Sequence, residues 1–362
     1  MTVLGVAGCT ALLLIGFGIQ DSILPIVDKQ SGQLTHNDLT ISLSDEKALT
    51  MEQGLADTLD SSSAVHSWGA FYTKSTTLYN EEGGSADVSI VGAEDDARMT
   101  EYFTFRTRVG HDPIPFEEDS VILTEKTALN LGLSVGDTFY VEAADGSRVP
   151  LVLTGITENY MFTRLYLSNA QLQALLGGTP EWNTVYGLTG CTTEAEYNAL
   201  RTKLLGCNYV SSVSFTEDTT SMFGSLIGSL NYVVVLIIVC AAALAAVVLY
   251  NLISVNLAER KKELATIKVL GFYDKEVYRY IFREIELLSL IGSGVGLLLG
   301  VPLHRFIVLT VEMDQLMFIR TIAPHSYLLA VALTMLFTFV VCFAMRRHVR
   351  HISMVESMKA PE

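Results

Sequence analysis

A basic segment lies between two long apolar runs in the second half of the chain, and this arrangement limits what the chain can fold into. The run 232–255 is long enough to cross a bilayer, and a second apolar run occupies 285–311. The segment 257–284 between them carries seven lysines and arginines. Because short loops rich in Lys and Arg stay on the cytoplasmic side, the sequence predicts a membrane protein with this segment in the cytoplasm.

Two further apolar stretches predict two further membrane helices. The stretch 2–19 contains no charged residue and predicts a first helix within 1–25, and 325–346 predicts the fourth. A signal peptide is the alternative for the first stretch, but it has no basic residues before the apolar core, which favours an uncleaved helix. The tail 347–362 begins with a second basic cluster, so both termini are expected in the cytoplasm.

The region between the first two apolar stretches has the composition of a water-exposed domain. Residues 20–229 contain 11 lysines and arginines against 29 aspartates and glutamates, whereas the whole chain has a formal net charge of −15. An acidic domain of this kind argues against nucleic-acid binding, which requires basic patches. We therefore expect residues 26–222 to form an extracytoplasmic domain inserted between membrane helices 1 and 2.

Short strand and helix signals alternate through this domain. Alternating apolar residues predict strands at 39–43, 86–91 and 209–215, and Asp145-Gly146 predicts a hairpin between the strands 138–143 and 149–154. A helix is predicted over 49–59. Capping boxes at Ser168 and Thr193 predict that helices start there. The fold class is therefore an α-helical membrane protein with four transmembrane helices and an α+β extracytoplasmic domain.

A search for catalytic motifs finds none. The chain has no phosphate-binding G-x-x-x-x-G-K-[ST] loop, no H-E-x-x-H and no G-x-S-x-G. We therefore expect no enzyme activity, cofactor or metal site in this chain. Cys191 and Cys207 both lie in the predicted outside domain, and their spacing leaves open whether they form a disulfide.

The cytoplasmic segment contains two short amphipathic helices separated by a glycine. Leu264, Ile267 and Leu270 recur at helical spacing, Gly271 ends that helix, and Asp274 can cap the next one. This pattern suits docking to a cytoplasmic partner. It equally suits a helix lying on lipid headgroups, and the pattern alone does not separate the two.

The sequence ERKKELATIKVLGFYDKEVYRYIF within this segment resembles the signature of FtsX-like permeases, the permeases of MacB-, LolC/LolE- and FtsX-type ABC transporters. The stretch 121–146 similarly resembles the extracytoplasmic domain of MacB-type permeases. Family members usually carry a cytoplasmic lead-in before the first helix, so the resemblance also implies that upstream sequence is absent and that the chain is the C-terminal half of a longer permease.

The resemblance implies a coupling helix that docks into a separate cytoplasmic ABC ATPase, which would hold ATP and Mg. The residues expected to make this contact with the ATPase are Lys262, Glu263, Thr266, Ile267, Val269, Leu270 and Gly271. It further implies a second permease half, as a homodimer mate or a fused repeat, and a place in the plasma membrane of a bacterium.

Three glycines in the third apolar run share a four-residue spacing. Gly292, Gly296 and Gly300 form two consecutive G-x-x-x-G steps, which allow two helices to approach closely in lipid. Packing within one subunit and dimerisation explain this pattern equally well.

These features favour a permease subunit that couples ATP hydrolysis in its partner to mechanical motion of the outside domain. The motion would serve export, extraction of a lipid or lipoprotein, or regulation of an extracellular partner. The alternative is a membrane-anchored sensor or scaffold with an extracellular binding domain and no ATP coupling. The short outside loop 312–324 is too small to be a domain.

Overall fold

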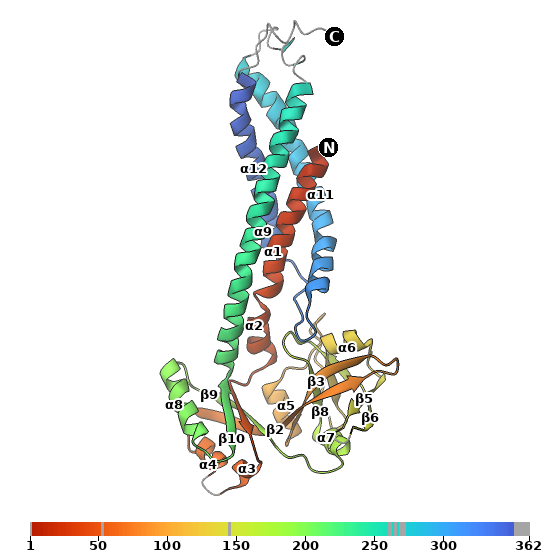
Figure 1. The fold of residues 1–362 in the computed structure, drawn as a ribbon, viewed down its shortest axis with the longest axis vertical. Helices are drawn as coiled ribbons and strands as arrows, with labels where there is room; N and C mark the ends of the chain where they lie inside the picture. Colours follow the sequence, from red (N-terminus) through yellow and green to blue (C-terminus); the bar gives the residue numbers. More distant parts are fainter. Residues whose placement is uncertain are drawn as a thin grey trace. The chain divides into compact units, whose positions relative to one another are not determined.

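The computed structural model describes residues 2–51, 54–143, 146–259, 263, 266–267 and 273–350. It separates into two compact units (Figure 1). The helical unit comprises Met1–Leu24, Ile227–Val311 and Ile319–Glu362, and the α+β unit comprises Pro25–Leu226 together with Glu312–Phe318. The predicted outside loop is therefore divided, and its first part belongs to the α+β unit.

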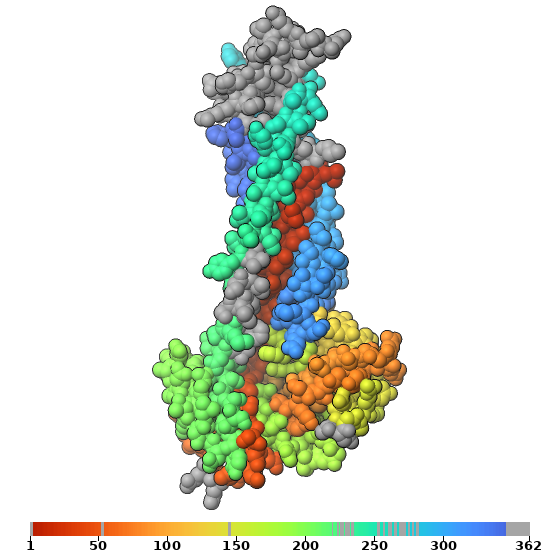
Figure 2. Space-filling model, in the orientation of Figure 1, coloured from red at the N-terminus to blue at the C-terminus, as the bar shows by residue number. Residues whose placement is uncertain are grey.

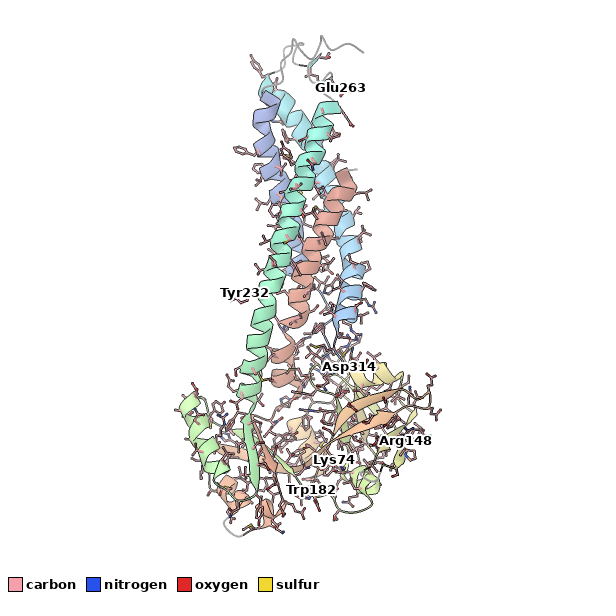
Figure 3. The ribbon with its side chains drawn as sticks, viewed as in Figure 1. Lys74, Arg148, Trp182, Tyr232, Glu263 and Asp314 are labelled. Atoms are coloured by element: carbon pink, nitrogen blue, oxygen red, sulfur yellow. The ribbon has the colours of Figure 1, made fainter. Side chains whose placement is uncertain are left out.

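Long apolar helices build the helical unit. They are α1 (Thr2–Ile23), α9 (Thr216–Glu259, which starts in the α+β unit), α11 (Asp274–Val311) and α12 (Pro324–Arg350). In this unit the red of α1 runs beside the blue of α11 in the space-filling view (Figure 2). Tyr232 projects outward from α9 and is 80% exposed (Figure 3).

Three helical stretches among the described residues are long and apolar enough to cross a membrane: Val3–Leu34, Phe282–Val311 and Pro324–Ala344. They include the first, third and fourth predicted spans. Within α9, Val235–Asn251 is a shorter apolar stretch. The second predicted span stays a prediction, and so does the predicted total of four transmembrane helices.

The α+β unit is organised on a ten-stranded mixed sheet, in the order β10-β1-β9-β2-β3-β8-β4-β7, with β5 pairing β2 and β6. Its strands are β1 (Leu39–Leu43), β2 (Val65–Tyr79), β3 (Ser85–Ala93), β4 (Val121–Thr124), β5 (Thr138–Glu142), β6 (Arg148–Val152), β7 (Gly155–Thr157), β8 (Arg164–Leu167), β9 (Thr184–Thr189) and β10 (Val210–Phe215). The predicted α+β class of this region is confirmed.

Short helices accompany the sheet in this unit. They are α2 (Ile26–Lys29), a π-helical turn η1 (Gln30–Leu34), α3 (Lys47–Thr50), α4 (Leu55–Asp60), α5 (Asp96–Tyr102), α6 (Glu125–Leu131), α7 (Asn169–Leu176) and α8 (Glu194–Leu205). The single helix predicted over 49–59 is wrong, because the chain forms α3 and α4 instead. Gly54 lies between them in an extended conformation, where a Cβ would approach the Met51 carbonyl oxygen to 2.7 Å.

The longest strand, β2, holds the two halves of the sheet together. Its first part pairs with β9, most of its length pairs with β3, and its last two residues pair with β5. The β5–β6 hairpin forms where it was predicted, although Asp145 lies outside the described residues. Arg148 at the start of β6 stacks on Tyr79 of β2, 3.8 Å from the ring centre. The sheet therefore behaves as one scaffold for the loops at its edges.

Candidate functional site

The loop 158–163, which we call the junction loop, joins β7 to β8. It is hydrogen-bonded to the chain that follows α1. The side chain of Gln30 is buried here, and its Oε1 accepts hydrogen bonds from the backbone N–H groups of Tyr160 (2.9 Å) and Met161 (3.2 Å). Its Nε2 donates to Asn159 Oδ1 at 2.8 Å. Because every one of these groups is buried, removing Gln30 would leave several polar atoms without a partner.

The junction loop is also bound by Glu312–Phe318, which we call the strap. The strap is the chain that leaves α11 and leads toward α12. Met161 and Leu316 form an antiparallel bridge, flanked by hydrogen bonds from Phe162 N to Gln315 O (3.0 Å) and from Met317 N to Tyr160 O (2.9 Å). The junction loop therefore contacts the segments that continue two different long helices.

A buried ion pair fixes the start of the strap. Lys126 Nζ lies 2.8 Å from Glu312 Oε2, and the two side chains are only 14% and 1% exposed. The other carboxylate oxygen of Glu312 accepts the backbone N–H of Phe318 at 2.9 Å, which closes the strap on itself. A pair this well buried is sensitive to the loss of either partner, since water cannot readily replace the lost interaction.

The junction loop contains a strained residue. Phe162 has a φ of 64°, in the left-handed region that non-glycine residues rarely adopt. Its backbone is held there by the bond to Gln315 and by Asn159 Nδ2, which donates to the Phe162 carbonyl at 2.5 Å. Strain of this kind persists only where the surroundings enforce it and is concentrated at functional sites.

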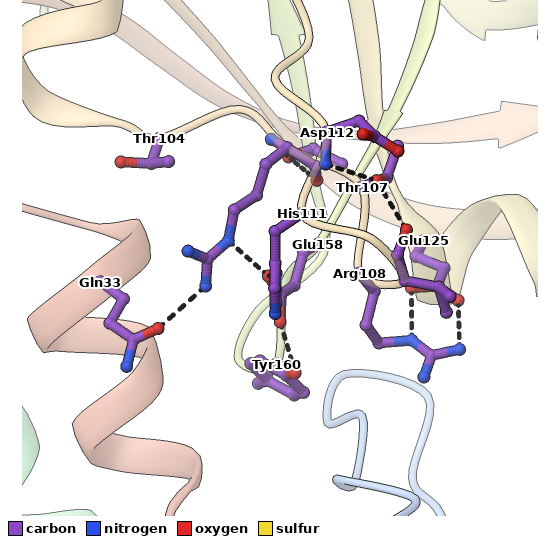
Figure 4. Close-up of polar contacts among 12 residues, drawn as sticks. Gln33, Thr104, Thr107, Arg108, His111, Asp112, Glu125, Glu158 and Tyr160 are labelled. Atoms are coloured by element: carbon purple, nitrogen blue, oxygen red, sulfur yellow. Dashed lines mark hydrogen bonds and ion pairs between the residues drawn. The ribbon is translucent and has the colours of Figure 1, made fainter.

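A polar network anchors the base of the junction loop (Figure 4). The buried Glu158 carboxylate accepts from Arg106 Nε at 2.6 Å and from the Tyr160 hydroxyl at 2.5 Å, and it lies 3.4 Å from His111 Nδ1. Arg106 Nη2 also donates to Gln33 Oε1 at 2.9 Å, which adds a second link to η1. Burial, and then the bond to Glu158, raise the pKa of the Tyr160 phenol, so the hydroxyl stays protonated and donates.

A bidentate pair orients the neighbouring helix α6. Arg108 donates to both carboxylate oxygens of Glu125 at 2.8 and 2.9 Å (Figure 4). Glu125 is the first residue of α6 and directly precedes Lys126. Fork-shaped pairing of this kind fixes orientation as well as position, and so it directs the α6 side chain that binds the strap.

In the helical unit, the three glycines of α11 lie against α1. A Cβ at Gly296 would meet the Ala7 carbonyl oxygen at 2.6 Å, and one at Gly292 would meet Val6 Cβ at 2.8 Å. A Cβ at Gly300 would meet Leu14 at 2.9 Å. Within the described residues, these glycines thus permit close contact between two helices of the same chain.

Buried hydroxyl groups join the same helices at the level of the glycines. Thr10 of α1 lies 3.1 Å from Thr334 of α12 and 3.5 Å from Ser293 of α11, measured between the side-chain oxygens. His304 of α11 is also buried, and its Nε2 lies 3.1 Å from the Ser22 hydroxyl of α1. Hydrogen bonds of this type hold helices together in lipid.

The predicted coupling residues are described only in part. Glu263 and Thr266 are exposed, and Ile267 packs beside a buried cluster that contains Leu249 and Phe282. Lys262, Val269, Leu270 and Gly271 lie outside the described residues. Elsewhere, Cys191 and Cys207 are both free thiols. No group of three or more His, Cys, Asp or Glu that could hold a metal ion occurs in the part of the chain that the structure describes.

Sequence reasoning did not single out Gln30, Glu158 or Glu312. Each acts through partners that are distant in the chain, 129 positions for Gln30 and Asn159 and 186 for Lys126 and Glu312. The only local feature that pointed to any of these residues was the position of Glu312, an acidic residue directly after the apolar end of a predicted membrane helix. A charge at that position is ordinary for an outside loop, so the pattern alone did not indicate a buried partner.

Comparison with known proteins gives two matching families. The MacB-like periplasmic core domain matches residues 2–202, and the FtsX-like permease C-terminal domain matches residues 235–354. No curated protein matches the chain.

Solved structures that match part of the chain include two domains of transporters. The periplasmic region of MacB from Actinobacillus actinomycetemcomitans is 13% identical, with a TM-score of 0.33, and the match covers 53% of this chain and 94% of that one. The extracellular domain of the noncanonic ABC-type transporter YknZ from Gram-positive bacteria is 14% identical, with a TM-score of 0.32, and the match covers 50% and 99%.

Proposed function

The chain belongs to the family of FtsX-like permeases with a MacB-like periplasmic core domain, and we propose that it uses ATP hydrolysis in a separate ATPase to move its α+β unit. A permease role in an ABC transporter follows from the family. In this proposal the chain itself hydrolyses nothing, and ATP and Mg bind the partner. The proposed place is the bacterial inner membrane, with both termini in the cytoplasm and with a second permease half beside it.

The observation that carries the proposal is that two separate chain segments bind the same junction loop. Gln30 lies on the chain that continues α1, and Leu316 lies on the chain that continues α11, yet both bind the same loop of the α+β unit. A displacement of either helix along its axis would therefore pull on the junction loop through hydrogen-bonded segments. Since this loop runs directly into β7 and β8, a pull on the loop would act on the sheet.

The tight contact between α1 and α11 supports the same mechanism. With glycines at the contact and hydroxyl groups bonded across it, the two helices are suited to move as one body. The motion of the ATPase is proposed to reach the permease at the coupling residues around Thr266, which are close in sequence to the start of α11. We propose that a permease built in this way performs mechanical work on a substrate outside the membrane and does not form a hydrophilic channel.

Site-directed crosslinking tests the proposed ATPase contact. Thr266→Cys, in a chain whose five native cysteines have been replaced, is expressed in the native host, and the isolated membranes are treated with a thiol crosslinker. We expect a product of permease plus ATPase whose yield depends on the nucleotide. Leu309→Cys, exposed near the other end of α11, is the control and should give none. Labelling of Thr266→Cys by lipid alone, with no ATPase captured, would favour a sensor or scaffold.

A further inference from the structure

Arg164, the first residue of β8, carries a guanidinium group that lacks an anionic partner in the part of the chain that the structure describes. The residue as a whole is half-buried, and its Nη1 atom is fully buried with no hydrogen-bond partner there. None of the ion pairs found among the described residues includes Arg164. A buried cationic donor without a partner is costly, and a ligand that supplies the missing acceptor is one explanation for it.

Aromatic side chains surround this guanidinium group. The ring centres of Phe103 and Phe162 lie 5.5 and 5.8 Å from its central carbon. Tyr166 is two positions further along β8, so it is on the same face of the sheet as Arg164. The phenol groups of Tyr166 and Tyr186 are both close enough to act on the guanidinium charge. Aromatic rings attract a cation but are weak hydrogen-bond acceptors, so they do not replace an anion.

The charge of Arg164 matches an anion that carries a single negative charge. Burial raises the pKa of the Tyr186 phenol, so this hydroxyl is neutral and does not supply the charge itself. A carboxylate neutralises one guanidinium group, whereas a phosphate dianion would leave one charge uncompensated. Arginine also pairs with carboxylates through strong, charge-assisted hydrogen bonds. A carboxylate is therefore the favoured acceptor for Arg164.

The rings around Arg164 predict that the rest of such a ligand is apolar. Phe162 is 43% exposed, whereas Phe103, Tyr166 and Tyr186 are only 2%, 3% and 7% exposed. Phe162 belongs to the junction loop, which Arg164 directly follows. A ligand that reaches Nη1 would therefore enter past the Phe162 ring and place its own body against it. Apolar walls around a few polar groups are typical of sites for small organic molecules.

We propose that Arg164 binds the carboxylate of an amphiphilic monoanion whose apolar body packs against Phe162. Two sources share this chemistry, a fatty acid and the C-terminus of an apolar peptide. The site goes beyond the proposed transport function, because it gives the junction loop a ligand of its own and its occupation requires no ATPase.

Isothermal titration calorimetry of the full chain, purified in a non-ionic detergent, tests this proposal with two pairs of probes. N-acetylphenylalanine represents a peptide C-terminus and octanoate represents a fatty acid, and each is compared with its own amide. We expect the carboxylate from the correct source to bind about tenfold more tightly than its amide, which cannot form charge-assisted bonds. The pair that shows this preference identifies the source.

A matched pair of variants assigns the preference to Arg164. Arg164→Met should remove it. Arg148→Met should retain it, because Arg148 also lies over an aromatic ring, that of Tyr79, but is exposed to water. This control removes the same charge and the same kind of ring contact from the α+β unit.

Three results would overturn the proposal. The first is equal binding of acid and amide in both pairs by the unmodified chain, a result that requires no variant and so applies even if Arg164→Met fails to fold. The second is an unchanged preference in Arg164→Met. The third is displacement of the carboxylate probe by an equal concentration of acetate, which would make Arg164 a site for any small anion. None of these results involves the ATPase, so a failure here leaves the transport proposal untouched.

Discussion

Lys126 and Glu312 are 186 positions apart in the sequence, and their side chains meet in a buried ion pair of 2.8 Å. The pair ties α6 of the α+β unit to the first residue after α11. A few residues further along the strap, Leu316 bridges the junction loop. Through these two contacts, a segment covalently attached to membrane helices becomes part of the α+β fold.

Breaking this ion pair on one side should be costly. Lys126→Met removes a buried cation 2.8 Å from the Glu312 carboxylate, and we expect a loss of about 3–5 kcal/mol in the free energy of unfolding. Lys74→Met, at an exposed position of β2, is the control and should change it by less than about 0.5 kcal/mol. Urea unfolding followed by tryptophan fluorescence measures both. Equal stability of the two variants would show that the pair contributes nothing.

Gln30 should matter far more than Gln33, although the two are neighbours in η1. Gln30→Ala leaves the N–H groups of Tyr160 and Met161 without acceptors, which should cost about 1–3 kcal/mol and loosen the junction loop. Gln33 is exposed, so water can replace its bond to Arg106 in Gln33→Ala. Amide hydrogen exchange of residues 158–163 distinguishes them. Equal exchange rates in both variants would contradict the assigned role of Gln30.

Two glycines of α11 offer a matched test of helix packing. Gly296→Ala places a Cβ 2.6 Å from the Ala7 carbonyl oxygen, so the backbones of α1 and α11 must separate, at about 1–3 kcal/mol. Gly294→Ala has no atom within 4 Å and should be tolerated. The melting temperature in detergent should fall only for Gly296→Ala. A fall of the same size for both would mean that close approach at Gly296 is unimportant.

The bridge between the strap and the junction loop can be trapped chemically. Met161 and Leu316 are opposite each other between two flanking hydrogen bonds, an arrangement that brings Cα atoms to about 4.5 Å. This distance suits a disulfide. In a chain without native cysteines, M161C/L316C should therefore oxidise spontaneously, detected as a faster band on non-reducing gels. Either single variant is the control, and persistent free thiols in the double variant would refute the bridge.

Local signals predicted much of the α+β unit. The capping box of Thr193 and Glu196 is present at the start of α8, and Ser168 caps α7 through the Gln171 N–H. Both depend on residues only three positions apart, so the sequence contains the whole interaction. The strand predictions at 39–43 and 86–91 are confirmed for the same reason, because alternation is a local pattern.

Features that depend on distant partners were missed. No strand was predicted at β2, because it is buried to different extents along its length and pairs with three other strands, so its apolar residues do not alternate regularly. The junction loop and the strap were missed because their bonds join residues that only the sheet brings together. The predicted coupling residues remain predictions, since most of them lie outside the described part of the chain.

The central claim is that motion reaches the α+β unit through the strap, and a distance measurement in the assembled transporter tests it most directly. Spin labels at Lys74 of the α+β unit and Leu328 of α12, both exposed, would be measured by pulsed electron resonance with and without ATP bound to the ATPase. The account predicts that ATP shifts the distance, and that flexible Gly-Ser insertions on both sides of Glu312–Phe318 abolish most of that shift while leaving ATP binding intact. An unchanged shift in the insertion variant, or no shift in the uninterrupted chain, would contradict it.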